Sequence, residues 1–333
     1  MKFDASGDWR PSAAPEVLKL RARMLQGIRA FFSERVVLEV ETPALSTTAT
    51  PDPALASLAT RYTGPGAPRG QTLYLHTSPE FAMKRLLAAG SGSIYQICKV
   101  FRDGEAGRLH NPEFTMLEWY RVGMDHHQLM DEVAELVARA LAGKRRLQPS
   151  EKLSYREIFE HRLGIDPHTA TAADCARVAR VEGIAIPADL HEHHDVAIWR
   201  DLLLSHLIEP GLGQDRLTFV YDFPASQASL ARIRPSQPPV AERFELYLHG
   251  IELANGFHEL ADASEQLTRF ERQLHARTVS GLPPVPLDQR LLAALSEGLP
   301  DCSGVALGFD RLVMLAAGAR SITDVIPFPI DRA

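Results

Sequence analysis

The sequence predicts an α+β fold in which helices flank an antiparallel sheet. Segments with strand character follow one another without the regular βαβ alternation of a parallel sheet, for example at residues 94–103 and 114–121. No internal repeat is visible. The 333 residues, of which 45% are hydrophobic and 23% charged, suffice for one large domain or two modest ones with a proper core.

Composition and charge narrow the class of protein. The formal net charge is −6, and the densest cationic run, Lys144-Arg145-Arg146, is interpreted as a solvated helix end, so avid non-specific binding to nucleic acid is not expected. The three cysteines form no Cys-x-x-Cys pair, which argues against a disulfide framework or a zinc site. Residues 1–12 are polar and no apolar run is long enough to span a membrane, so we expect a cytoplasmic protein.

The chain should begin with an amphipathic helix at residues 15–35, where apolar residues recur near a helical period. "VVLEVETPAL" follows with the β-branched content of a strand, and Pro43 confines that strand to an edge, an end or an interface. Residues 46–70 are rich in Ser, Thr, Pro, Gly and Ala. They predict an irregular or hairpin-like excursion before the strand "TLYLHT".

A short helix with clear end signals is expected in "TSPEFAMKRLLAAG". Thr77 or Ser78 can cap it, Pro79 suits its first turn and Gly90 suits its end. Glu80 lies in the first turn, where complementing the helix dipole would already explain its presence.

The next two strands should be joined by the glycine-containing loop "GEAGRLHNPE". Alternation along the second strand places Phe114, Met116, Glu118 and Tyr120 on one face. That face carries an aromatic ring, a carboxylate and a phenol, although a solvent-facing sheet surface shows a similar alternation.

A long helix at about residues 126–142 precedes a segment, residues 147–215, with a helical pattern and polar breaks. The histidine group "HEHH" at residues 191–194 raises the question of a metal site. A solvated loop or helix end is the preferred interpretation, because no second cluster of ligands is evident.

Strand character returns in "LTFVYDFP" and "RFELYLHGIEL", and Asn255-Gly256 then predicts a two-residue hairpin turn. Such a turn would place Glu252 directly opposite Glu259, where like charges repel. Either both side chains diverge into water or a positive group lies beside them.

A charged helix at about residues 262–280, a Pro-rich link and a helix at about 287–297 should lead to "GVALGFDRLVMLAAG". There, Arg311 lies in the first turn of a helix that begins after Gly308. Arg311 and the free N–H groups of the helix N-terminus could together hold a phosphate. A surface arginine paired with Asp310 is the alternative.

Together these residues predict one carboxylate-rich site that also contains two arginines. Such a composition is expected where Mg²⁺-bound ATP lies beside a cationic amine substrate. The residues are Glu80, Glu118, Glu245, Glu252 and Glu259, with Arg102 and Arg311.

These stretches resemble the motifs of a known family. "FRDGEAGRLHNPEFTMLEWY" is similar to motif 2 of the class II aminoacyl-tRNA synthetases, "GVALGFDRLVML" to motif 3, and "FFSERVVLEVETPAL", with Pro43, to motif 1. The sequences "HNPEFTMLEWY" and "GIELANGFHEL" most resemble those of lysyl-tRNA synthetases. The resemblance covers nearly the whole chain, with the motifs in the family's order.

The resemblance implies the class II catalytic fold, as a single domain over residues 1–333 with a helical insertion at about 147–215, and a homodimer formed through motif 1. Only about fourteen residues precede the motif 1 helix, so we expect no anticodon-binding OB domain and no tRNA partner. This combination looks like the lysyl-synthetase paralogues that attach (R)-β-lysine to a lysine of elongation factor P.

The resemblance also implies how ATP and Mg²⁺ are bound. Arg102 and Arg311 would be the catalytic residues, with Arg102 on the α-phosphate of ATP and Arg311 on the terminal phosphates, while Phe114 stacks on adenine. Glu245 and Glu252 would hold Mg²⁺. The implied ATP-binding set also contains Asp103, Gly104, Asn111, Glu252, Leu253 and Gly308.

For the amino acid, the resemblance implies that Glu80 and Glu118 bind the amino group near the reacting carboxylate. Tyr120 and Glu259 would receive the side-chain ammonium group. The implied amino-acid-binding set also contains Ser78, Pro79, Asn255 and Ala306, and Asn111 would assist in the site.

Two positions depart from the family pattern. Motif 2 usually has a glutamate where this chain has Gly104, with Glu105 next, which puts the adenine-side contact in doubt. Lysyl-tRNA synthetases usually have glycine where this chain has Ala306. One added methyl group can shift selectivity by roughly 1–3 kcal/mol, which would disfavour α-lysine and accommodate an amino group moved by one carbon.

The implied reaction has two steps. The amino-acid carboxylate attacks the α-phosphorus of ATP, with Mg²⁺ and arginines stabilising the developing charge, and a lysine ε-amine of the partner protein then displaces AMP. No side-chain nucleophile is required, in agreement with the lack of a Ser/His/Asp or Cys/His arrangement. The alternatives are a truncated lysyl-tRNA synthetase-like enzyme that activates α-lysine or acts on tRNA, and an inactive paralogue that senses amino acids.

Overall fold

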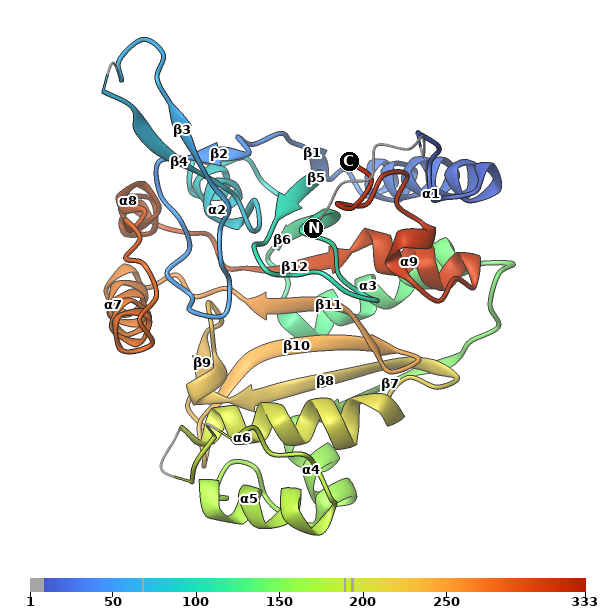
Figure 1. The fold of residues 1–333 in the computed structure, drawn as a ribbon, viewed down its shortest axis with the longest axis vertical. Helices are drawn as coiled ribbons and strands as arrows, with labels where there is room; N and C mark the ends of the chain where they lie inside the picture. The colour runs from blue at the N-terminus through green and yellow to red at the C-terminus, as the bar shows by residue number, and fades with distance from the viewer. Residues whose placement is uncertain (1–8, 68, 189, 193–194) are drawn as a thin grey trace.

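A nine-stranded sheet forms the centre of the part of the chain that the computed structural model describes, residues 9–67, 69–188, 190–192 and 195–333 (Figure 1). Its order is β1-β5-β6-β12-β11-β10-β8-β7, with β9 paired to β10. Neighbouring strands are antiparallel except in the outermost pairs, β1/β5 and β7/β8. The strands are β1 Leu38–Glu39, β5 Ile94–Phe101, β6 Glu113–Val122, β12 Cys302–Gly308, β11 Ile251–His258, β10 Val240–Leu248, β8 Arg216–Pro224, β7 Gln148–Ser154 and β9 Ile233–Arg234.

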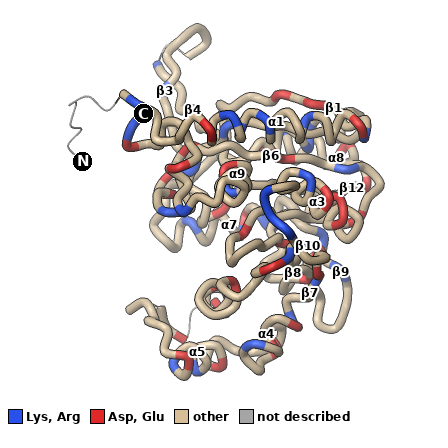
Figure 2. The backbone as a smooth tube through the Cα atoms, turned by 90° about the vertical axis from the view of Figure 1, so that its right-hand side faces the viewer, with Lys and Arg blue, Asp and Glu red and all other residues tan. Residues whose placement is uncertain are grey.

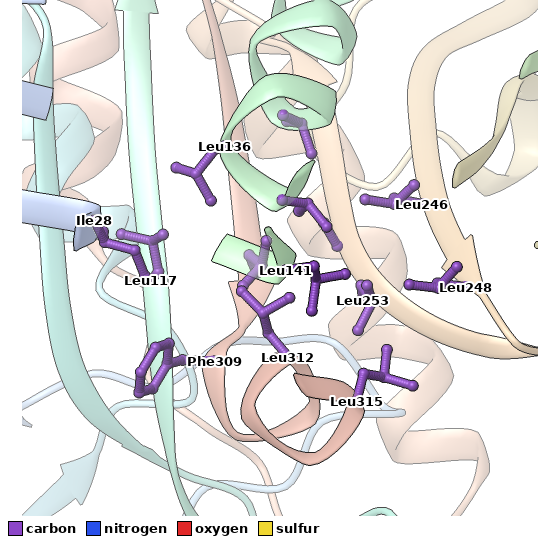
Figure 3. Close-up of a cluster of buried hydrophobic side chains, with 14 of the residues drawn as sticks. Ile28, Leu117, Leu136, Leu141, Leu246, Leu248, Leu253, Phe309, Leu312 and Leu315 are labelled. Carbon is purple, nitrogen blue, oxygen red and sulfur yellow. The ribbon is translucent and has the colours of Figure 1, made fainter. Parts of the chain in front are cut away.

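One face of the sheet is covered by α1 (Pro15–Glu34), α3 (His126–Leu141) and α9 (Phe309–Ala317). Buried residues recur along each helix at helical spacing, so one apolar stripe per helix faces the sheet. Figure 3 shows the cluster that results, with residues from all three helices packed against β6, β10 and β11. This core occupies one side of the sheet and leaves the other side available for a site.

Two smaller apolar clusters support the ends of the sheet. Helices α4 (Tyr155–Leu163), α5 (Ala172–Val181) and α6 (Val196–Leu203) lie beside β8 and β10, at the bottom of Figure 1. Helices α2 (Glu80–Ala88), α7 (Ala263–Val279) and α8 (Gln289–Glu297) gather at the other end, near β5 and β12. The helices expected in these stretches are therefore confirmed.

A separate three-stranded sheet, in the order β2-β4-β3, precedes α2. It comprises β2 (Leu45–Ser46), β3 (Ala59–Tyr62) and β4 (Gln71–Leu75), and the β3–β4 hairpin projects from the body of the molecule (Figure 1). The hairpin-like form of the predicted excursion is confirmed. Pro43 lies between β1 and β2 and belongs to neither.

The predicted hairpin turn at Asn255-Gly256 is wrong. The turn between β10 and β11 is formed by His249 and Gly250, both with positive φ, of 53° and 67°. Gly256 lies within β11, where an added Cβ would come 2.4 Å from the ring of Phe244. Glycine is therefore required here because the ring of Phe244 packs against the backbone, and not because the chain turns.

The predicted pairing of the two glutamates fails with the turn. Glu252 pairs with Tyr247, and Glu259 follows the last residue of the same strand. The two carboxylates are therefore not cross-strand partners, although both line the same cavity.

The segment expected to be helical, residues 147–215, begins with a strand. Strand β7 pairs in parallel with β8 at the edge of the large sheet, and its sequence, QPSEKLS, lacks an apolar alternation that would have indicated it. In the "HEHH" group, His193 and His194 lie outside the described residues, whereas Glu192 pairs with Arg180 at the surface.

Positively and negatively charged residues are both distributed along the described part of the chain. Figure 2 shows Lys and Arg interspersed with Asp and Glu along the backbone, as expected from the small net charge. Among the described helices, none has both the length and the apolar character that a bilayer crossing requires.

Candidate active site

A cavity of about 900 Å³ opens on the face of the sheet opposite the main core, and the first turn of α9 contributes to its wall. The alternation predicted for β6 is confirmed, because Phe114, Met116, Glu118 and Tyr120 line the cavity while Leu117 and Trp119 are buried in the main core. The predicted residues in its wall are Ser78, Glu80, Arg102, Asn111, Phe114, Glu118, Tyr120, Glu245, Glu252, Leu253, Asn255, Glu259, Ala306, Gly308 and Arg311.

Three predicted residues do not line the cavity. Asp103 donates its backbone N–H to the carbonyl of Ala56, and Gly104 takes a φ of +78° in the loop after β5. Glu105 instead lies in the wall, with Oε1 3.5 Å from Nη1 of Arg102. Pro79 immediately precedes α2, where Ser78 Oγ accepts the N–H of Glu80.

One end of the cavity contains a buried group of carboxylates. Glu118 is 2% exposed, and its two oxygens accept hydrogen bonds from the hydroxyls of Ser78, at 2.7 Å, and Tyr120, at 2.8 Å. Burial and the charge of Glu80 raise the pKa of Glu118 to about 8. This end of the cavity therefore favours a cation that would keep the carboxylates ionised.

Lys84 joins two of these carboxylates. Its ammonium group is buried and lies 2.6 Å from Glu259 Oε2 and 2.8 Å from Glu80 Oε1. Burial opposes the charge, but Glu259 and Glu80 raise the pKa of Lys84 above its ordinary value. Burial raises the pKa of Glu259 to about 7, even though Lys84 acts in the opposite direction.

Strand β12 forms the floor between these groups. Ala306 pairs with Glu118 on β6 and with Asn255 on β11, so its methyl group lies between two predicted amino-acid contacts. An added Cβ on Gly304 would lie 2.3 Å from the ring of Tyr120 and 2.5 Å from Glu259 Oε1. The small residues Gly304 and Ala306 on β12 therefore leave space for the side chains of Tyr120 and Glu259 in the cavity.

The other end of the cavity contains the two arginines. Arg311 donates to the carbonyl of Glu252, at 2.8 Å, and lies 2.7 Å from Nε2 of His110, while Arg102 stands over the ring of Phe114, 5.2 Å from its centroid. The alternative pairing of Arg311 with Asp310 is wrong.

Asp310 points into the protein instead. It is 1% exposed, forms an ion pair with Arg21 of α1 and accepts the backbone N–H of Thr115. Because Asp310 is held in this way, the neighbouring Arg311 is directed into the cavity.

A second group of carboxylates lies near Arg311. Glu245 is bonded to Arg243 and to the hydroxyl of Tyr247, and that hydroxyl lies 3.2 Å from Glu209. Burial and the charge of Glu245 raise the pKa of Glu252 to about 7, and the same two causes raise the pKa of Glu209. The excess of negative oxygen ligands suits a hard divalent cation.

The charged residues that the sequence analysis missed include Arg243 and Glu209, which line the cavity, and Lys84, which is buried beside it. Lys84 stands four residues after Glu80 on a predicted helix, and Arg243 stands two residues before Glu245 on a predicted strand, so their spacing carried a usable signal. Glu209 comes from the segment to which no chemistry was assigned, and only the packing after α6 brings it to the cavity.

Ionisation of Glu118 should destabilise the substrate-free protein. A carboxyl group whose pKa is higher in the folded state binds more protons there than in the unfolded chain, so stability is lost as pH rises from about 4 towards 8. We expect Glu118→Gln to unfold at a higher temperature than the parent at pH 9. The variant should nevertheless lose more than about 100-fold in kcat/KM for an amine substrate, from an unpaired ammonium group costing about 3–5 kcal/mol.

Melting curves between pH 5 and 9, with kinetics at pH 8, measure both effects. Glu113→Gln, on the exposed start of the same strand, is the matched control. Equal melting temperatures for Glu118→Gln and the parent across this range would contradict the assigned pKa.

Comparison with known proteins assigns the chain to a family. The family model of the class II tRNA synthetases (D, K and N) matches residues 6–332, and the chain belongs to this family. More specifically, it is 53% identical over 326 residues to the elongation factor P–(R)-β-lysine ligase of Klebsiella pneumoniae, covering 98% of each chain. It is 52% identical, with the same coverage, to the enzyme of that name from Salmonella paratyphi B.

Proposed function

We propose that this protein is an ATP-dependent ligase that activates (R)-β-lysine as an adenylate and transfers it to a lysine ε-amine of elongation factor P. Identity of 53% over 98% of the chain to enzymes named for that reaction supports the proposal. The structural observation that carries it is the group formed by the buried Glu118 and Glu259 with the half-buried Glu80, in the same cavity as Arg102 and Arg311. The ammonium groups of a diamino acid are complementary to the carboxylates, and the phosphates of a nucleoside triphosphate are complementary to the arginines.

The two ammonium groups of the amino acid would be shared between the carboxylates. Glu80 and Glu118, with Ser78 beside them, suit the amino group nearer the carboxylate. Glu259 and Tyr120 suit the more distant one. Asn255 lies next to Ala306 in the sheet and is placed to orient the substrate.

At the other end, Arg102 and Phe114 suit the α-phosphate and adenine, and Arg311 suits the terminal phosphates. In the first step, a carboxylate oxygen of the amino acid bonds to the α-phosphorus, and the bond to pyrophosphate breaks. In the second step, the neutral ε-amine of the acceptor attacks the acyl carbon, AMP leaves with the bonding electrons, and the amine loses a proton. The arginines stabilise the negative charge that develops on the phosphate oxygens.

Glu245 and Glu252 are the residues that would hold Mg²⁺, with Glu209 as an additional carboxylate. When bound, Mg²⁺ would neutralise phosphate charge. Arg243 and Tyr247, bonded to Glu245, orient its carboxylate.

We further propose one cytoplasmic catalytic domain that works as a homodimer through motif 1, residues 31–45. Val36, Leu38 and Leu45 are exposed there by 91%, 55% and 45%, beside the edge strand β1, and a second copy would cover them. A monomer mass in sedimentation velocity at micromolar concentration would contradict the dimer.

ATP–pyrophosphate exchange with (R)-β-lysine and α-lysine in parallel tests the function, with purified elongation factor P and tRNA added separately to detect transfer. Preferential exchange with β-lysine and label on the protein alone is expected. Exchange favouring α-lysine with label on tRNA would indicate a truncated synthetase, and no exchange with either would indicate an amino-acid sensor.

Ala306→Gly should relax the choice of amino acid. Its methyl group narrows the floor between Glu118 and Asn255, so removing it should raise kcat/KM for α-lysine relative to β-lysine by about 10- to 200-fold. Exchange kinetics with both amino acids measure the ratio. Ala254→Gly, a neighbouring small residue on β11, serves as the control. An unchanged ratio would remove Ala306 from the specificity-determining residues.

A further inference from the structure

A cluster of ionisable side chains lies outside the cavity, at the end of the sheet where α3 begins. His126 is the first residue of α3, Glu242 belongs to β10 and His258 is the last residue of β11. All three are buried, and one donor atom from each lies within 4.8 Å of the other two. None of them lines the cavity.

His126 is a buried side chain without a satisfied nitrogen. It is 2% exposed, and neither ring nitrogen has a hydrogen-bond partner among the described residues. Unpaired buried polar groups of this kind destabilise the folded protein unless a ligand occupies them. An imidazole nitrogen that no protein group occupies is available to ligate a metal ion.

The carboxylates around His126 are oriented by an arginine. Arg234 bonds to Oδ2 of Asp222, and its Nη1 lies 3.7 Å from Oε1 of Glu242. The other oxygens face the histidines, with Glu242 Oε2 2.7 Å from His258 Nδ1 and Asp222 Oδ1 3.9 Å from His126 Nε2. Asp222 is thus placed as a fourth donor.

His258 is supported from behind. Its Nε2 lies 3.0 Å from Oδ1 of Asp301, an oxygen that also accepts a hydrogen bond from Arg232 at 2.6 Å. A carboxylate bonded to the distal nitrogen of an imidazole fixes its tautomer and orientation in many metal sites. With the proton on Nε2, Nδ1 carries the lone pair that a metal ion requires, and it faces Glu242.

We propose that His126, Glu242 and His258, with Asp222, form a binding site for a divalent transition metal, for which Zn²⁺ is the best fit. Two imidazoles and one or two carboxylates match the ligands of Zn²⁺, whereas Mg²⁺ and Ca²⁺ prefer oxygen alone. The two carboxylates and Arg234 leave one negative charge for the dication.

Binding needs a rearrangement of the side chains. Ligands about 2.0–2.1 Å from a tetrahedral Zn²⁺ stand roughly 3.3 Å apart. Glu242 Oε2 and His258 Nδ1, which are 2.7 Å apart, would therefore separate by about half an ångström, while donor atoms that lie up to 4.8 Å apart would approach by up to about 1.5 Å. The metal would then connect α3, β8, β10 and the end of β11, immediately before Glu259 in the chain.

Metal analysis of the untagged protein tests the site. After growth with added zinc and gel filtration, we expect close to one equivalent of Zn²⁺ per chain. The metal-free protein should bind one Co²⁺ with the visible absorption of a tetrahedral site. Less than about a tenth of an equivalent of Zn²⁺, with no such absorption on Co²⁺ titration, would overturn the proposal.

Variants locate the metal. His126→Gln should abolish stoichiometric binding, and Asp301→Asn should weaken it by about 10- to 100-fold in a chelator competition. The side chain of Asp301 is 64% exposed, so Asp301→Asn should leave the packing of the core unchanged. The control removes the sequence group at residues 191–194 by His191→Gln, His193→Gln and His194→Gln. Loss of metal in this control, with retention in His126→Gln and Asp301→Asn, would place the metal elsewhere and sink the proposal.

Discussion

Replacing Arg311 by alanine should reduce the rate of adenylate formation by about 100- to 1,000-fold, since each preorganised donor to developing charge contributes on that scale. Arg311 is the only cationic side chain of α9, and its guanidinium lies in the cavity wall, held by the carbonyls of Glu252 and Leu109. Its loss would leave phosphate charge facing the carboxylates of Glu245 and Glu252. ATP–pyrophosphate exchange measures the effect.

Arg311→Lys is the informative companion to the alanine variant. Lysine keeps the charge but lacks the planar fork that bonds the two carbonyls and a phosphate together, so recovery should be partial. Arg272→Ala, at an exposed position on α7, is the matched control and should exchange at the parent rate. Parent-like exchange by Arg311→Ala would remove this residue from the catalytic assignment, whatever its thermal stability.

Lys84→Met should lower the free energy of unfolding by about 3–5 kcal/mol at pH 8, because it leaves the carboxylates of Glu80 and Glu259 without their buried cation. The loss should be smaller at pH 5, where the carboxyl groups can take up protons. The sign follows from the folded protein, in which the pKa of Glu259 is already raised to about 7 with Lys84 in place. Urea unfolding at the two pH values measures the difference.

Two further variants separate charge from packing at this position. Arg85→Met removes a cation from the exposed side of the same helix and should change stability by less than about 0.5 kcal/mol. Lys84→Arg keeps the charge in a bulkier group, so it should be more stable than Lys84→Met at pH 8. A loss in Lys84→Met that is equal at pH 5 and pH 8 would contradict the electrostatic explanation.

Periodicity and end signals were sufficient for most elements that build the site. The alternation of β6 and the helix that carries Arg311 follow from spacing alone, because each is imposed by backbone geometry that does not depend on the rest of the chain. Resemblance to the family then supplied roles that spacing could not. Of the eighteen different residues it implied, fifteen line one cavity and three, Pro79, Asp103 and Gly104, lie beside it.

The failures came from tertiary context. Asn255-Gly256 has the local signature of a turn, but the chain turns at His249-Gly250, and Gly256 is needed for the approach of Phe244. Strand β7 forms by pairing with the edge of β8. The sequence QPSEKLS itself has no pattern that predicts a strand. Glu209 reaches the cavity only after α6 and the short turn behind it have packed.

The ion pairs of Lys84 determine the charge balance at the amino-acid end of the cavity. Glu80 and Glu259 pair with the one internal ammonium group, that of Lys84, and Glu118 lies beside them without a cation among the described residues. Full ionisation of the three carboxylates therefore leaves an excess of two negative charges. In the empty pocket, protons held by groups with raised pKa values cover part of that excess. Under the proposed function, recognition replaces these protons by the two ammonium groups of the amino acid. A monoamine would leave one carboxylate uncompensated, and selection for a diamino acid then follows from charge balance before any contact with its carbon chain.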